Sequence, residues 1–177
     1  MTFMTDANIK ALVEKSFRHF HEHPELSYQE FQTTAYVRAE LEKAGIKILD
    51  TGLKTGLVAQ IGRGEGPVVA LRGDMDALPI QEETDLSYKS REAGRMHACG
   101  HDFHTAAVLG AALLLKKEEG NLPGTVKVIF QPAEEAPGGA KVVLDTGALA
   151  DVQAIFGIHI IVPVSYTHLT LPTIYSV

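Results

Sequence analysis

Several features that would mark particular classes of protein are scarce or absent in this sequence of 177 residues. Its one cysteine, Cys99, cannot form an internal disulfide, so we expect a reducing, cytoplasmic setting. Lys and Arg form no run longer than Lys116-Lys117 and the net charge is −6, so we expect no nucleic-acid partner, because phosphate binding needs a dense basic patch. The longest apolar run, 105–115, is too short to cross a bilayer, and residues 1–8 lack a signal-peptide pattern. We therefore expect no membrane association.

The hydrophobic pattern predicts an α/β domain with a mostly parallel central sheet flanked by helices. Helical spacing of apolar residues predicts helices over 6–23, 27–45, 104–117 and 139–144. Branched residues predict strands over 47–49, 57–61, 68–71, 125–130 and 154–158. Asp6 would cap the first helix, and Ser27 with Glu30 would form a capping box for the second. The glycine-rich segment 62–67 reads as a hairpin connection.

Four polar groups that can carry chemistry lie after predicted strands or just before a predicted helix. They are Asp74 with Asp76, Cys99 and His101 with Asp102, Glu134 with Glu135, and His159. Cys99 and His101 flank a glycine, which lets both bind one ion, and a thiolate with an imidazole suits zinc and tolerates manganese, cobalt or nickel. Asp102 would orient a histidine ligand or cap the helix. One glutamate of the pair could bind metal while its neighbour moves protons.

Each group has an ordinary structural explanation when it is taken alone. An aspartate near proline is a common turn former, a glutamate pair is usually a solvated turn, and a lone histidine or cysteine is often a core residue. The groups gain weight together, because the carboxyl ends of parallel strands meet at one edge, where open α/β sheets form their sites. The predicted fold would gather all of these candidate ligands there.

Five stretches spanning almost all of residues 1–161 carry a resemblance to a known family. They are His21-x-x-Pro-Glu-Leu-Ser27, Asp74-Met-Asp-Ala-Leu-Pro79, Met96-His-Ala-Cys-Gly-His-Asp102, Phe130-Gln-Pro-Ala-Glu-Glu135 and Gly157-Ile-His159. In this order they resemble the M20 metallopeptidases, specifically the N-acyl-amino-acid amidohydrolases, which include hippurate hydrolases, auxin-conjugate hydrolases and N-acetyl-diaminopimelate deacetylases. Ala136 and Gly73 depart from the usual Gly and Ala of that branch, and both are small.

The resemblance implies a role for each matching residue. The metal ligands of the family match Cys99, His101, Glu135 and His159. Glu134 matches the general base, and Asp74 matches an active-site carboxylate with Asp76 as its neighbour. Two divalent ions (Zn, Mn, Co or Ni) would activate water and polarise the amide carbonyl of an N-acyl amino acid or small N-acylated peptide. Glu134 would pass the water proton to the leaving nitrogen.

The resemblance also implies that much of the family chain is missing here. The family continues into a lid domain, through which the full-length parent would form a homodimer, and then returns with further strands and a last histidine ligand. We therefore expect residues 1–163 to be the N-terminal part of a catalytic domain and the chain as given to be inactive. The alternatives are a di-metal aminopeptidase or dipeptidase acting on free N-termini, and a non-enzymatic metal-binding fragment.

Residues 164–177 break the pattern of the preceding sequence. The run VSYTHLTLPTIYSV contains no Asp, Glu, Lys or Arg and is rich in threonine and apolar residues. Val164 to Thr173 match the translation of a transposon-end sequencing adapter. We expect a non-native tail over 164–177 and an interruption of the natural chain near 161–163, the alternative being an unusual natural C-terminus.

Overall fold

The computed structural model describes residues 5–160, and the expected tail at 164–177 lies outside these described residues. The elements are α1 (Asp6–Glu22), α2 (Phe31–Lys43), β1 (Lys47–Ile48), β2 (Leu57–Ile61), β3 (Val68–Asp74), α3 (His101–Lys117), a 3-10 turn (Glu119–Asn121), β4 (Thr125–Gln131), α4 (Gly139–Leu144) and β5 (Ala154–Gly157). Thr5, rather than Asp6, caps α1, because the Thr5 hydroxyl accepts the backbone N–H of Asn8 at 3.3 Å.

The α/β class is confirmed, but the sheet is mixed rather than mostly parallel. Its order is β1-β2-β4-β3-β5, in which β3 pairs parallel with β4 and β5, and β2 pairs antiparallel with β1 and β4. The predicted hairpin over 62–67 is therefore wrong, because β4 lies between β2 and β3. Every residue of β4 is buried, as its central position requires. Gly62 and Gly66 instead let the connection pass closely over the backbone that leads into β4, with positive φ angles of 103° and 73°.

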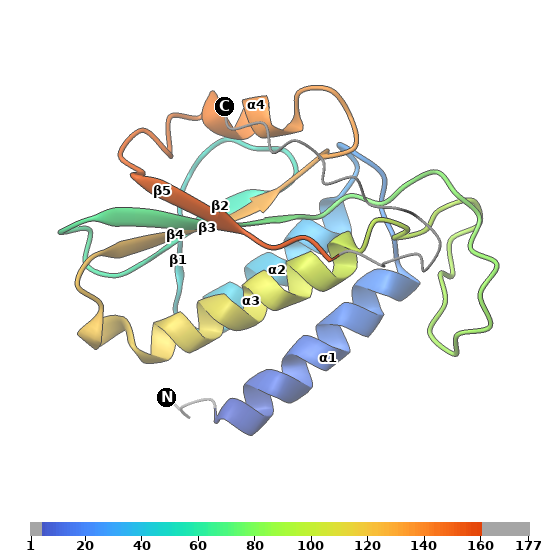
Figure 1. Cartoon of the computed structure of the whole chain (residues 1–177), viewed down its shortest axis with the longest axis horizontal. Helices are drawn as coiled ribbons and strands as arrows, with labels where there is room; N and C mark the ends of the chain where they lie inside the picture. Colours follow the sequence, from blue (N-terminus) through green and yellow to red (C-terminus); the bar gives the residue numbers. More distant parts are fainter. Residues whose placement is uncertain (1–4, 161–177) are drawn as a thin grey trace, which may run out of the picture.

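Helices cover the two faces of the sheet unequally. Helices α1, α2 and α3 lie on one side and the short α4 on the other (Figure 1). Because successive strand residues point to opposite faces, Val128 and Phe130 of β4 join the larger core beneath α2 and α3, while Ile129 packs toward α4 with Val143. The two hydrophobic layers enclose β4, all of whose residues are buried. A site at the carboxyl ends of β4 and its neighbour β3 is thus built against a well-packed core.

The entry into α2 differs from the predicted capping box. The helix begins at Phe31, and the side chain of neither Ser27 nor Glu30 accepts a hydrogen bond from its first turn. The carboxylate of Glu25 does so instead, accepting the backbone N–H groups of residues 32 and 33 at 3.1 and 2.8 Å. The side chains of Ser27 and Glu30 turn inward, toward residues that follow β3 and β4.

The strand β5 forms an open edge of the sheet within the described part of the chain. It pairs with β3 alone, and all four of its residues are exposed. Ile155, Phe156 and Ile158 are 53%, 59% and 71% exposed, and an apolar groove runs between this strand and Phe103 and Val108 of α3. An edge of this kind, with large apolar side chains beside it, is a surface that another segment or molecule can cover.

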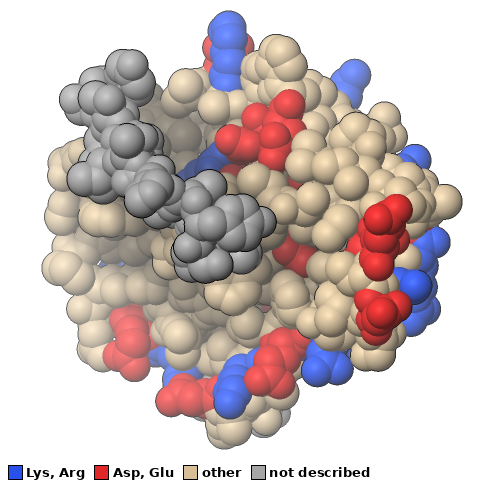
Figure 2. Space-filling view, turned by 45° about the vertical axis from the view of Figure 1, so that its right-hand side comes forward, with Lys and Arg blue, Asp and Glu red and all other residues tan. Residues whose placement is uncertain are grey.

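The face shown in Figure 2 carries charged side chains of both signs. Where Figure 2 shows side chains rather than grey atoms, Lys and Arg are interspersed with Asp and Glu, and no broad basic field is visible on that face. Across residues 5–160, none of the helices combines the length and apolar character needed to span a membrane.

Candidate metal centre

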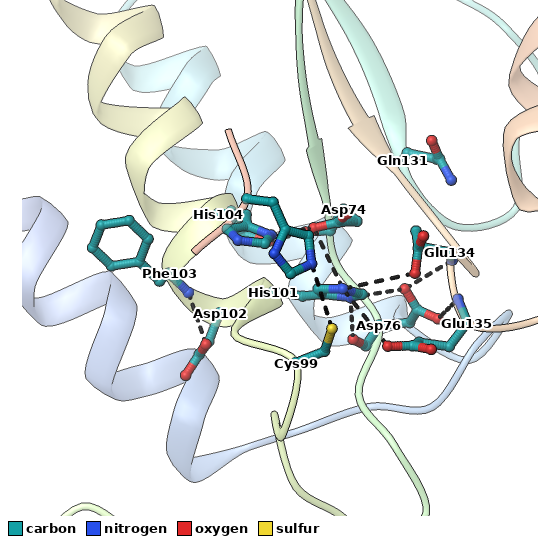
Figure 3. A network of polar contacts seen from close by, with 12 residues as sticks. Asp74, Asp76, Cys99, His101, Asp102, Phe103, His104, Gln131, Glu134 and Glu135 are labelled. Atoms are coloured by element: carbon teal, nitrogen blue, oxygen red, sulfur yellow. Dashed lines mark hydrogen bonds and ion pairs between the residues drawn. The ribbon is translucent and has the colours of Figure 1, made fainter. Parts of the chain in front are cut away.

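The expected ligands converge at one edge of the sheet. Asp74 ends β3, the Glu134–Glu135 pair follows β4, and His159 follows β5, while Cys99 and His101 enter from the start of α3 (Figure 3). Ligand atoms lie within 4.8 Å of one another in the group Cys99, His101 and His159, in the group His101, Glu134 and Glu135, and in the group Asp74, His101 and His104. His101 belongs to all three groups. It is the first residue of α3, so this helix begins three residues earlier than predicted.

The imidazole of His101 is fully buried and is oriented by Asp76. Its Nδ1 lies 2.8 Å from the Asp76 carbonyl oxygen and 3.3 Å from Asp76 Oδ1, so Nδ1 carries a proton and donates it. The other nitrogen, Nε2, has no hydrogen-bond partner among residues 5–160. It lies 3.8 and 3.9 Å from carboxylate oxygens of Glu134 and Glu135, beyond hydrogen-bond range.

A buried lone pair that faces carboxylate oxygens is the arrangement that a cation satisfies. Burial alone would lower the pKa of His101, but the hydrogen bond to Asp76 and the charges of Asp74, Asp76 and Glu134 outweigh it and raise that pKa. The pocket around Nε2 therefore favours positive charge. A divalent ion supplies that charge, and the residues present fit it through sulfur, nitrogen and oxygen donors.

Asp76 forms hydrogen bonds to several parts of the site. Its Oδ1 accepts the backbone N–H of Glu134 at 2.9 Å, and its Oδ2 accepts the N–H of Glu135 at 3.0 Å and the hydroxyl of Ser27 at 2.6 Å. Burial would raise the pKa of Asp76, but the hydrogen bonds from His101, Ser27 and the two N–H groups lower it to about 2. One buried carboxylate thus fixes the His101 ring and the glutamate pair together.

The lowered pKa of Asp76 predicts that this site is sensitive to acid. Because the folded-state pKa is about 2 and the ordinary value is 3.8, ionised Asp76 stabilises the fold above about pH 4, and that stability is lost as the pH falls through 2. The difference corresponds to about 2 kcal/mol. Urea unfolding between pH 5 and pH 2 should show this loss in the wild type and a smaller loss in Asp76→Asn. Asp145→Asn, at an exposed position, serves as the control and should lose as much stability as the wild type. An equal loss of stability in Asp76→Asn and Asp145→Asn would contradict the prediction.

Asp102 does not orient His101, contrary to one of its two expected roles. It turns away from the cluster (Figure 3) and accepts a hydrogen bond from Nδ1 of His21 at 2.6 Å. The other nitrogen of His21 lies 3.1 Å from the carboxylate of Glu82. The hydrogen bond to Asp102, the largest effect, raises the pKa of His21. Asp102 therefore ties α1 to the first turn of α3, and it also accepts the N–H of Phe103 in that turn.

Cys99 lies at the open side of the cluster, with Sγ 3.5 Å from Nε2 of His159. Burial, followed by the hydrogen bond and charge of Glu135 and the charge of Glu134, raises the pKa of the thiol to about 11. Cys99 is therefore a thiol at neutral pH unless a cation binds it. In His159, Nδ1 donates to the carbonyl of Ile160 at 2.7 Å, which leaves Nε2 as the atom that can bind metal.

Asp74 acts on the cluster through His104, for which the sequence predicted no role of its own. Its Oδ1 accepts from Nδ1 of His104 at 2.7 Å, and its Oδ2 pairs with Arg72 at 2.7 Å. The Nε2 of His104 then accepts the backbone N–H of Ile160 at 3.0 Å. Asp74 and His104 thereby hold the segment that carries His159. The three-residue spacing of His104 from His101, which places both on one helix face, was the available signal.

Comparison with known proteins agrees with this geometry. Residues 70–172 match the family described as Peptidase family M20/M25/M40. The chain is 57% identical over 144 residues to N-acetylcysteine deacetylase of Bacillus subtilis (strain 168), which covers 80% of this chain and 38% of that relative. It is 53% identical over 143 residues to IAA-amino acid hydrolase ILR1-like 4 of Arabidopsis thaliana, and the match covers 81% of this chain and 32% of that relative.

A solved structure is similar as well. It is a Bacillus subtilis protein described as a dinuclear metal binding peptidase from the M20 family, with a TM-score of 0.84 and 53% identity over 88% of this chain and 44% of that one. The chain spans about a third of the length of the curated relatives it matches. The family match extends over more than half of the sequence, and the folds and motifs agree with it. This chain therefore belongs to peptidase family M20/M25/M40.

Proposed function

We propose that this chain is part of a metal-dependent hydrolase that cleaves the amide bond of N-acyl amino acids or small N-acylated peptides. The observation that carries the proposal is the buried Nε2 of His101, which lacks a partner among the described residues and faces Glu134 and Glu135. The substrate class is supported by two relatives, which are named a deacetylase of N-acetylcysteine and a hydrolase of IAA-amino acids.

Cys99, His101, Glu135 and His159 would hold two divalent ions. Their donor atoms fall into two overlapping groups, one with the thiol and one with the glutamates, and the free Nε2 of His101 can serve one ion of the two. The similar solved structure is described as dinuclear. Sulfur and nitrogen donors suit Zn, Co and Ni, and the carboxylate also suits Mn. Ions at this position supply Lewis acidity, which lowers the pKa of water and polarises an amide carbonyl.

Glu134 would be the general base. Its carboxylate lies 3.8 Å from Nε2 of His101, and its side chain is 40% exposed, so it can reach both the centre and the open space in front of it. The backbone N–H of Glu134 is held by Asp76, which fixes the backbone from which the side chain extends. In this role the carboxylate takes a proton from water and delivers it to the leaving nitrogen. Asp74 would be the buried active-site carboxylate, 3.8 Å from Nε2 of His101.

We further propose that the 177-residue chain is inactive alone and that its full-length parent is a homodimer. The chain covers about a third of its relatives, and the apolar edge at β5 lies beside His159. A site with this edge uncovered admits bulk water, which weakens the electrostatic interactions on which hydrolysis depends. Hydrolysis of an N-acetyl amino acid by the purified chain would overturn this part of the proposal.

Metal binding with proton release tests the proposal on the chain itself. The pKa of Cys99 is about 11, so binding of Zn²⁺ at neutral pH must displace its proton, and affinity should rise roughly tenfold for each pH unit. Titration calorimetry in two buffers of different ionisation enthalpy should show about one proton more for the wild type than for Cys99→Ser. Failure of the wild type to bind Zn²⁺, Mn²⁺ or Co²⁺ would sink the proposal, and equal proton release by both proteins would remove Cys99 from it.

A further inference from the structure

The segment from Glu25 to Glu30 begins within the stretch His21 to Ser27 by which the chain resembles its family, yet the proposed reaction uses none of its residues. The segment lies directly against the end of β3. Leu26 forms a parallel bridge with Ala77, and the N–H of Ala77 donates to the Glu25 carbonyl at 2.8 Å. From here the Ser27 hydroxyl reaches Asp76. The segment is therefore packed beneath the candidate metal centre.

Glu30 reaches the same centre from a fully buried position. Its Oε1 accepts the backbone N–H of Ala133 at 2.7 Å, while its Oε2 has no hydrogen-bond partner among residues 5–160. Burial raises the pKa of Glu30 above its ordinary value. A carboxyl group without a cationic partner in the described structure is costly to bury, and the hydrogen bond from the Ala133 N–H, beside contributions from the Thr55 side chain and the backbone of residues 28 and 30, offsets part of that cost.

The contact with Ala133 holds a strained turn. Ala133 has a φ of 51°, in the left-handed region that an alanine rarely adopts, and it directly precedes the Glu134–Glu135 pair. On the other side the backbone of Gly139 presses so closely that a Cβ there would lie 2.0 Å from the Ala133 carbonyl oxygen. The three successive N–H groups of residues 133–135 all donate to buried carboxylates, the first to Glu30 and the next two to Asp76.

We propose that Glu30 is a positioning residue for the Glu134–Glu135 pair, acting through the backbone N–H of Ala133. Asp76 alone fixes the two glutamate N–H groups but leaves the residue before them free to relax out of its left-handed conformation. Glu30 holds that residue and so sets where the turn begins. The role rests on the proposed metal centre, because the glutamates need to be placed only if they bind an ion and move a proton.

The test compares Glu30→Leu with Glu30→Gln by Co²⁺ titration of the 177-residue chain in competition with a chelator. Leucine removes the acceptor for the Ala133 N–H, whereas glutamine keeps one. Loss of a group that orients a metal ligand typically costs 10–100-fold in affinity, so Glu30→Leu should bind the ion held by the glutamates about that much more weakly. Glu30→Gln should bind it nearly as the wild type does. The cobalt–thiolate charge-transfer band of Cys99 should persist in both variants.

The matched control is Glu25→Leu. Glu25 lies in the same segment and also accepts backbone N–H groups, but those of α2, so its loss should lower the melting temperature without weakening Co²⁺ binding. If Glu30→Leu does not fold by circular dichroism, Glu30→Asp decides, since its shorter side chain keeps a carboxyl group but withdraws the acceptor from the Ala133 N–H. Wild-type affinity in a folded Glu30→Leu or Glu30→Asp, or equal weakening in Glu25→Leu, would overturn the inference. No Co²⁺ binding by the wild type would instead overturn the proposed function.

Discussion

Replacing Glu134 by glutamine is expected to abolish hydrolysis while metal binding stays close to that of the wild type. Glutamine keeps the size of the side chain and the backbone N–H that Asp76 holds, but it cannot take a proton. General-base catalysis contributes roughly 10²–10⁴-fold to a rate, so kcat on an N-acetyl amino acid should fall by about that factor. The measurement needs the full-length enzyme, with kcat and metal content determined on the same preparation.

The neighbouring Glu135 supplies a control in which metal content, rather than kcat alone, should change. Glu135→Gln removes a proposed ligand from the group that contains His101 and Glu134, so it should lower metal content first and activity as a consequence. Excess metal should restore part of the activity of Glu135→Gln and none of that of Glu134→Gln. Full turnover in a metal-loaded Glu134→Gln enzyme would show that another group moves the proton.

Replacing His101 by alanine is expected to remove nearly all metal binding from the 177-residue chain. His101 is the residue common to all three groups of potential ligands, and its buried Nε2 is the potential ligand atom that the carboxylates surround. Loss of groups that only orient ligands costs up to about 100-fold in affinity, so loss of a ligand itself should exceed that factor. Co²⁺ titration with a competing chelator measures the change.

The change also removes a buried ring, so the fold must be monitored alongside the affinity. Circular dichroism and thermal unfolding of the apo proteins provide this check, and His23→Ala, at a partly exposed position on α1's C-terminal end, provides the matched histidine control. A folded His101→Ala protein that still binds Co²⁺ within about tenfold of the wild type would contradict the central place of His101, since a lost ligand should cost more.

The position of the centre could be predicted from sequence because it depends on a general property of parallel strands. Asp74, Glu134 and His159 each lie at or just beyond a strand end, and strands β3, β4 and β5 are mutually parallel, so their ends meet. The sheet order could not be predicted, because the apolar pattern of β4 is equally compatible with an edge beside β3 or with insertion between β2 and β3. Only the packing of its two buried faces selects the insertion.

The supporting residues were harder to recognise than the ligands. Ser27 and Glu30 have the spacing of a capping box, and that local pattern is identical whether the side chains bond to their own helix or turn inward. Here Glu25 occupies the helix end, so the other two are free to reach Asp76 and Ala133. Likewise Asp102 is next to His101 in the sequence, whereas Asp76 is close to it only in the fold. The direction of each side chain shows that Asp76 is the partner of His101.

The exposure of β5 has a consequence for how the centre is assembled. His101 belongs to the buried base of α3, whereas His159 extends from a strand whose side chains all face solvent. An ion bound by both residues would cross-link the least anchored strand of the sheet to the interior. If such an ion binds, occupancy of the centre and order along this margin would be thermodynamically linked, and each would favour the other by the same free energy.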